Sequence, residues 1–147
     1  MTLEIKNIFG NTVKLMPGVH LYRVQDFMGT PLHGLGINLV EADGESAGEP
    51  FATLTVSFGE FIGFKDCAYI DTNNCTFAPQ LLTMGIAEDT GFTKRSGYCE
   101  YPLWHFKEDF LKKIGGDRYL QYSSEYDQYM SAISGQDEEV KEEMNMV

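Results

Sequence analysis

The amino-acid sequence predicts a single α+β domain, an antiparallel sheet of about five or six strands with two or three helices, mainly C-terminal, on one face. Three observations support this prediction. Apolar residues recur at every second position in the first half of the chain, which is the period of a β-strand. From Phe106 onward they recur at steps of three and four, the period of a helix. The length of 147 residues fits one domain.

The first predicted strands are short. Apolar residues alternate over residues 3–5, 13–15 and 19–21, and the turn signals Gly10-Asn11 and Pro17-Gly18 separate these runs. The sequence therefore predicts several short antiparallel strands before residue 25.

Further strands are predicted in the middle of the chain. The alternation continues at 35–39 and is strict over 53–58, which predicts a strand with one solvated face. Residues 64–71 contain an unbroken apolar run, which predicts a strand buried on both faces at the centre of the sheet. The segment 98–101 is expected to return to the sheet and to end at Pro102, which cannot donate to a strand ladder.

Three segments have helical signals. Thr76 is predicted to cap a helix of about two turns that has Pro79 in its first turn and ends at Gly85. A second helix starts near Phe106 and closes at Gly115-Gly116. A third is capped by Asp117, and whether it is one bent helix or two is left open.

The last helix carries an apolar stripe. Two interpretations are open: the stripe belongs to the core, which is favoured, or it becomes an interface where the sheet does not cover it. The stripe consists of Tyr119, Tyr122, Tyr126, Tyr129 and Ile133.

The folded domain is expected to span residues 1–134, and the acidic segment 135–147 is predicted to be a flexible tail.

The charge balance limits the classes of partner. The chain has 22 acidic and 11 basic residues, a net charge of -11. Nucleic acid and anionic membranes need cationic contacts, so neither is an expected partner, whereas a basic protein surface is attracted. The predicted partner-binding acidic surface consists of Glu41, Asp43, Glu45, Glu49, Asp137, Glu138 and Glu139.

The three cysteines predict neither a disulfide framework nor a metal site. Cys67, Cys75 and Cys99 lack the close pairing that is typical of structural zinc sites, so buried thiols are favoured. No cofactor is predicted. The first ten residues lack a signal peptide and no apolar run is long enough to span a membrane, so a soluble, cytoplasmic protein is expected.

A second candidate site combines a turn with a basic pair. An ordinary Asx turn is favoured for the turn and a solvated hairpin tip for the basic pair. Cys99 as a nucleophile, with His105 or His33 as its base, remains an alternative. The possible ligand-binding residues are Asp71, Asn73, Asn74, Lys94, Arg95 and His105.

Parts of the central third of the chain resemble a known family. The resemblance is carried by residues 68–74 (AYIDTNN), 90–91 (TG) and 96–106 (SGYCEYPLWHF). It is to an uncharacterised family of small acidic proteins encoded on conjugative elements and phages of gut Gram-positive bacteria. The resemblance implies no activity. It implies a context in which small acidic proteins often oppose host defence, some by imitating the charge of DNA.

The leading hypothesis is an acidic protein-binding module of a mobile genetic element. It would inhibit a host nuclease or other nucleic-acid-binding defence protein by charge mimicry. One alternative is a small-molecule-binding domain or small enzyme that uses the 71–74 turn and the 94–105 segment. Another is a domain without mimicry whose acidity serves solubility only.

Overall fold

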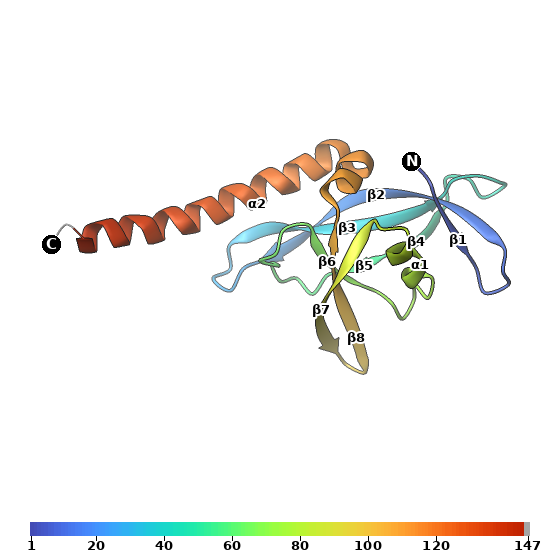
Figure 1. Cartoon of the computed structure of the whole chain (residues 1–147), viewed down its shortest axis with the longest axis horizontal. Coiled ribbons are helices and arrows are strands. Elements are labelled where there is room, and N and C mark those ends of the chain that lie inside the picture. The colour runs from blue at the N-terminus through green and yellow to red at the C-terminus, as the bar shows by residue number, and fades with distance from the viewer. Residues whose placement is uncertain (146–147) are drawn as a thin grey trace.

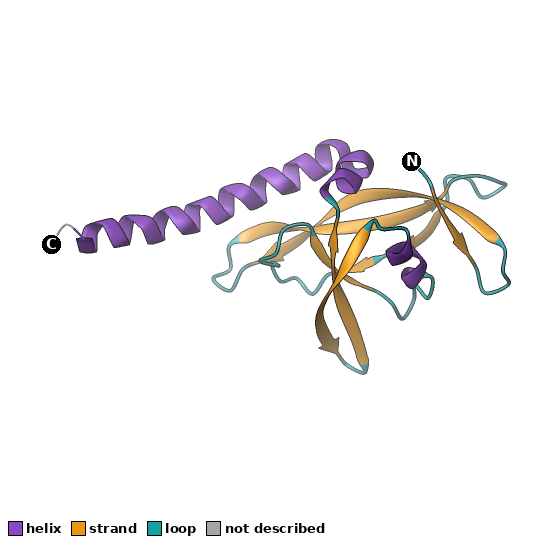
Figure 2. Cartoon of the chain, in the orientation of Figure 1, coloured by secondary structure: helices purple, strands orange, loops and turns teal. Residues whose placement is uncertain are grey.

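The computed structural model describes the backbone of residues 1–145 and the side chains of residues 1–134. Residues 1–145 form an α+β fold with two antiparallel four-stranded sheets, one short helix and one long C-terminal helix (Figures 1 and 2). In spatial order the first sheet contains β1 (Leu3–Lys6), β2 (Thr12–Gln25), β3 (Pro31–Glu41) and β4 (Pro50–Thr53). The second contains β5 (Thr55–Val56), β6 (Cys67–Ile70), β8 (Cys99–Phe106) and β7 (Ala87–Ser96).

The long β2–β3 ribbon replaces the short strands that were predicted. Leu15 to Gln25 pair without a shift with Glu41 to Pro31, so the expected turn at Pro17-Gly18 is wrong. The carbonyl of Val19, two residues further on, accepts from Arg118 and so points away from β3. Alternate residues of a strand direct their backbone N–H and C=O groups to the same side, so the nitrogen of Pro17, like the groups of Val19, faces away from β3. Proline has no N–H to donate, but at this position none is needed for pairing with β3.

The prediction of a single sheet of five or six strands is also wrong, because the chain changes sheet at Leu54. The Leu54 amide donates to the Ile37 carbonyl and the Leu54 carbonyl accepts from the Asp71 amide, each at 2.9 Å. The segment 53–58 is therefore divided between β4 and β5 instead of forming one strand. The predicted central strand is confirmed in a shorter form, because β6 lies between β5 and β8.

The two or three helices predicted on one face are instead one short helix and one long helix. Helix α1 (Ala78–Thr83) contacts β7, whereas α2 (Glu108–Asn145) packs on β2 and β3. Thr76 does not cap α1, since Phe77 occupies the N-cap and makes no side-chain cap bond. The break expected at Gly115-Gly116 is a kink within α2, where Gly116 has φ 51° and ψ -129°.

The core lies between the sheets and α2. A β-carbon on Gly115 would lie 2.9 Å from Val19 Cγ2 and 2.6 Å from Tyr119 Cβ, so a glycine is needed for α2 to approach β2 this closely. The largest fully buried side chains include Trp104, Tyr119, Phe106, Leu15, Ile37, Leu39, Leu54 and Ile70.

Beyond the core, the distal half of α2 projects past the sheets (Figure 1). Its backbone continues to Asn145, so residues 135–145 are helical. The side chains of Asp137, Glu138 and Glu139, which belong to the predicted acidic surface, lie outside the described side chains. No helix in the described part of the chain combines the length and the hydropathy needed to cross a membrane.

Candidate protein-interaction surfaces

The acidic loop, residues 41–49, joins β3 to β4 and is closed by its own backbone. The Glu41 amide donates to the Glu49 carbonyl at 3.0 Å, and the Gly48 amide donates to the Glu41 carbonyl at 2.8 Å. Gly44 and Gly48 have φ of 80° and 89°, the left-handed region in which glycine has no steric penalty. The backbone that carries the four carboxylate side chains is therefore held in one closed conformation.

Most of the charge on the acidic loop is not neutralised by the described side chains. Asp43, Glu45 and Glu49 are exposed, and among the described side chains the one ion pair to the loop joins Lys14 Nζ to Asp43 Oδ2 at 4.0 Å. Both of those side chains are largely solvated, at 48% and 62% exposure, so the pair is weak. Three other lysines pair elsewhere with carboxylates at 2.6 to 2.9 Å: Lys65 with Asp127, Lys94 with Glu60, and Lys112 with Glu108.

The predicted ligand-binding turn after β6 bonds to itself. The Asn74 side chain donates to Asp71 Oδ2 at 2.8 Å, and the Asn74 amide donates to Asp71 Oδ1 at 3.4 Å. Asn73 is exposed beside them. Both bonds lie within the turn and run to the residue three positions on, whereas an Asx turn, the favoured interpretation of this segment, bonds two positions on.

The remaining candidate ligand residues lie on one hairpin but not at one point. Ser96 pairs with Cys99 at the tip of the β7–β8 hairpin, and Arg95 is next to it, whereas His105 pairs with Cys67 at the opposite end of β8. His105 is six residue steps along the strand from Cys99, about 20 Å at the usual rise per residue. The structure therefore does not bring this thiol and this imidazole together as a nucleophile and base.

Lys94, the other basic residue of the pair, already has partners. Its Nζ donates to Glu60 Oε2 at 2.6 Å and lies 5.1 Å from the centre of the Phe58 ring. These contacts fix Lys94 against the protein's own surface.

Two of the cysteines have the properties of inert core thiols. Cys67 and Cys75 are buried, and burial raises the pKa of each thiol to about 11, with Asp66 and Asp71 adding to the respective shifts. Both thiols are therefore protonated near neutral pH. Among the described residues, no group of three or more His, Cys, Asp or Glu side chains is placed to hold a metal ion.

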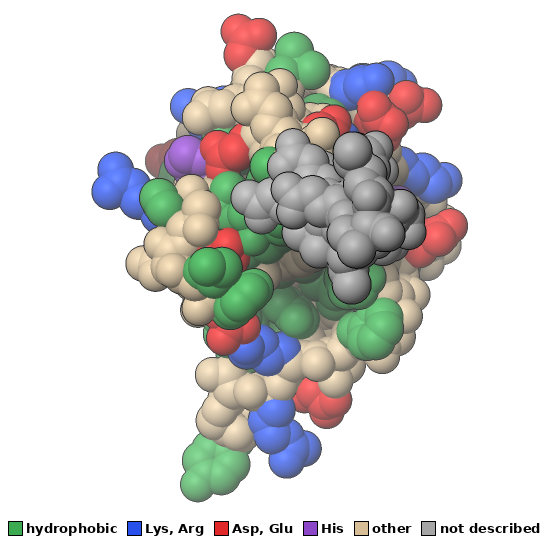
Figure 3. Space-filling view, turned by 90° about the vertical axis from the view of Figure 1, so that its left-hand side faces the viewer, with side chains coloured by type: hydrophobic (Ala, Val, Ile, Leu, Met, Phe, Trp, Pro, Cys, Tyr) green, Lys and Arg blue, Asp and Glu red, His purple; other side chains and the backbone are tan. Residues whose placement is uncertain are grey.

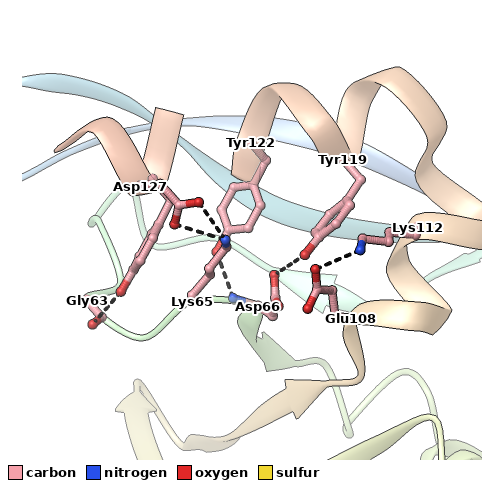
Figure 4. Close-up of polar contacts among 9 residues, drawn as sticks. Gly63, Lys65, Asp66, Glu108, Lys112, Tyr119, Tyr122 and Asp127 are labelled. Carbon is pink, nitrogen blue, oxygen red and sulfur yellow. Dashed lines mark hydrogen bonds and ion pairs between the residues drawn. The ribbon is translucent and has the colours of Figure 1, made fainter. Parts of the chain in front are cut away.

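The tyrosine clasp, formed by Tyr119, Tyr122 and Asp66, fastens α2 to the loop before β6 (Figure 4). The Tyr119 hydroxyl donates to Asp66 Oδ1 at 2.8 Å, and the Asp66 amide donates to the Tyr122 hydroxyl oxygen at 3.0 Å. Both tyrosines are buried, and Asp66 has the unusual φ of 63°. The core interpretation of the tyrosine stripe is thus correct for its N-terminal part.

The carboxyl group of the clasp predicts a pH effect on stability. Burial raises the pKa of Asp66, although Tyr119 and Lys65 partly oppose the shift. Between an unfolded pKa of about 3.9 and the raised folded value, the folded state binds more protons, so this group makes stability fall as pH rises. We expect the free energy of unfolding of Asp66→Asn, relative to wild type, to increase from pH 4 to pH 7, by about 1.4 kcal/mol per unit of pKa elevation.

Urea unfolding at the two pH values measures this difference. Asparagine tolerates the left-handed backbone that Asp66 adopts, so the variant is expected to fold. Asp109→Asn, at an exposed position, is the control and should show a smaller pH-dependent difference. A difference for Asp66→Asn that is flat or falls with pH would contradict the prediction.

The stripe emerges from the core at its C-terminal end. Tyr126 is buried and its hydroxyl donates to the Gly63 carbonyl at 2.8 Å, whereas Tyr129 is half-buried and Ile133 is exposed. Tyr129 donates to Asp26 and its ring meets the ring of Phe61 edge-on, with centroids 4.8 Å apart. The core interpretation therefore does not hold at this end, because Tyr129 is only half-buried and Ile133 is exposed.

The apolar groove lies at this uncovered end. It has a volume of about 460 Å³ and runs between α2, the β2–β3 hairpin tip and the segment 60–61. Figure 3 faces this end of the molecule and shows hydrophobic side chains gathered beside and below the segment drawn in grey. The groove is lined by Phe27, Phe61, Tyr129, Met130 and Ile133, with Gln25, Asp26 and Glu60 at its polar edge.

No sequence motif predicted this groove. Phe27 is 95% exposed although it is a large aromatic residue, and Met28 beside it is 77% exposed. A Phe-Met pair between Asp26 and Gly29, at a turn where polar residues are usual, was the available signal.

The chain belongs to the family defined by a domain of unknown function, DUF4313, whose family model matches residues 21–126. That span contains the acidic loop, the tyrosine clasp and the hairpin tip with Phe27. The α2 residues that line the groove, from Tyr129 onward, follow it. Comparison with curated proteins and with solved structures gives no match.

Proposed function

We propose that this protein is an acidic protein-binding module whose partner presents a basic surface. The observation that carries the proposal is the acidic loop, in which four carboxylates within nine residues stand on a closed backbone with one weak lysine contact among the described side chains. A preformed arrangement loses little conformational entropy on binding, and its unneutralised charge speeds encounter with a cationic surface.

The partner class follows from the charge. Proteins that bind nucleic acid have cationic grooves that accept closely spaced phosphates, and carboxylates on a rigid loop can occupy such positions. We therefore propose a nuclease or another nucleic-acid-binding protein as the partner, with the protein acting for a mobile genetic element against host defence.

Neutralising the acidic loop tests this function. The test variant changes Glu41, Glu45 and Glu49 to Gln and Asp43 to Asn. The control variant neutralises four exposed carboxylates elsewhere, with Glu4 and Glu88 changed to Gln and Asp89 and Asp117 changed to Asn. Both lose four charges. Binding to a panel of purified nucleases is measured at low and physiological salt, together with protection of a labelled DNA duplex from cleavage.

We expect the loop variant to bind more weakly by about fourfold or more, since exposed ion pairs contribute roughly 0.2–1 kcal/mol each and the removal of four costs about 0.8–4 kcal/mol. The control should stay within about threefold, and salt should weaken wild-type binding. Equal loss in both variants would show that only bulk charge matters. Absence of salt-sensitive binding to any of the nucleases would contradict the proposed function.

A further inference from the structure

We propose that the apolar groove is a second binding site on the same module, and that it receives a short helix of the partner with apolar residues on one face and lysine or arginine on its flanks. This inference rests on the proposed function, because it specifies the chemistry of the partner. It concerns a different surface from the acidic loop, at the other end of the β2–β3 ribbon (Figure 1).

The groove has the exposure of a binding surface. Phe27 is 95% exposed and Ile133 is 40% exposed, and both line the same hollow. Single exposed apolar residues are ordinary on protein surfaces, but several around one concavity mark a site for an apolar ligand or partner. A volume of about 460 Å³ accommodates several side chains.

The floor of the groove is held in place by contacts made inside the protein. Tyr129 is tied to Asp26 through its hydroxyl and to Phe61 through its ring, so it joins α2, the hairpin and the segment 60–61. The neighbouring Tyr126 bonds to the Gly63 carbonyl, which secures the loop that carries Phe61. A groove that exists before binding keeps the entropic cost of association low.

The shape of the groove favours a helix as its occupant. One wall is the α2 segment with Tyr129, Met130 and Ile133, which recur at helical spacing. A second helix can lie along such a wall and place residues i, i+3, i+4 and i+7 over the apolar floor.

The charge at the edge selects a basic partner over a second copy of this chain. Asp26 accepts from the Tyr129 hydroxyl and from the amides of Met28 and Thr30, all neutral donors, and the Tyr129 bond chiefly lowers its pKa. Glu60 is also at the edge, but it is already paired with Lys94 Nζ at 2.6 Å. Asp26 has no cationic partner among the described side chains. Two copies packed through this groove would bring the Asp26 carboxylates of both chains to one interface, on chains of net charge -11 each, whereas a cationic helix would neutralise Asp26.

Three designed peptides of about five helical turns test the proposal by fluorescence anisotropy. The first has leucine on one face and lysine elsewhere, the second replaces each leucine with alanine, and the third replaces each lysine with glutamate. The test protein is Phe27→Ser with Ile133→Asp. The matched control is Phe9→Ser with Leu120→Asp, which makes the same two changes at exposed positions outside the groove.

The leucine–lysine peptide is expected to bind wild type and the matched control equally, within about threefold, and to bind the groove variant at least tenfold more weakly. The alanine-containing and glutamate-containing peptides should each bind wild type at least about tenfold more weakly than the leucine–lysine peptide does. Equal binding of the leucine and alanine peptides, or equal loss in the groove variant and its control, would overturn the proposal. Far-UV circular dichroism confirms that each variant is folded.

Two further measurements separate this proposal from its alternatives. If sedimentation shows a dimer that the groove variant abolishes, the occupant is a second copy and the proposal is wrong. The loop-neutralised protein should retain peptide binding within about threefold. If the loop-neutralised protein loses peptide binding and the groove variant keeps it, the peptide binds the acidic loop. That result would leave the proposed function intact and overturn the groove proposal.

Discussion

Truncation of Leu54 to alanine is expected to lower the free energy of unfolding by about 2–5 kcal/mol, the largest effect predicted for a single side chain here. Leu54 is fully buried, and its backbone bonds to Ile37 in the first sheet and to Asp71 beside the second. Removing its side chain leaves a cavity where the two sheets meet, and the bonded backbone restricts the relaxation that would fill it.

Urea denaturation followed by circular dichroism measures this loss. Leu120→Ala removes the same atoms from a leucine that is 55% exposed and should change stability by no more than about 0.5 kcal/mol. Equal effects at the two positions would show that the junction at Leu54 is not a tightly packed part of the core.

Replacement of Tyr119 by phenylalanine is expected to cost about 1–3 kcal/mol. The ring stays in its buried site, so the change removes one hydroxyl and little volume. Asp66 Oδ1 then loses its donor while remaining buried, and an unsatisfied buried acceptor carries a desolvation cost. The pKa of Asp66 should rise further, since the Tyr119 bond now opposes the effect of burial.

Tyr98→Phe is the matched control for this experiment. Tyr98 is fully exposed at the β7–β8 turn, so loss of its hydroxyl should be neutral to within about 0.5 kcal/mol. Thermal and urea unfolding of the two variants beside wild type gives the comparison. If Tyr119→Phe unfolds like Tyr98→Phe, the clasp does not contribute to stability as we describe.

The clasp also links stability to the proposed binding groove. Tyr119 and Tyr122 hold Asp66, and one turn further along α2 Tyr126 holds Gly63. The same loop carries Phe61, part of the groove floor. The buried tyrosines therefore hold in place the loop whose Phe61 lines the groove together with Tyr129 and Ile133.

Part of the candidate site could be predicted from composition alone. The acidic loop contains four carboxylates and two glycines in nine residues, which indicates an exposed turn with high charge wherever it lies in the fold. The groove could not be found in this way. The Phe27-Met28 pair and the end of the tyrosine stripe at Ile133 are each unusual locally, but they are distant in the chain, and no sequence pattern indicates that they share one surface.

The tyrosine stripe shows most clearly what the sequence by itself determined. Its spacing of three and four established a helix with one apolar face, because that period follows from local backbone geometry. The acidic excess and the α+β class could also be predicted from the sequence, since they depend on composition and on periodicity within short segments.

Only the tertiary structure decided where the stripe leaves the core and where one sheet becomes two. Both depend on contacts between segments far apart in the chain: Tyr119 with Asp66, and Leu54 with Ile37 and Asp71. Residues 53–58 alternate as one strand would, yet the backbone partners of Leu54 come from two other segments, and no local pattern records that choice. How far the sheets extend under α2, and so how much of the stripe they bury, likewise depends on packing between distant segments.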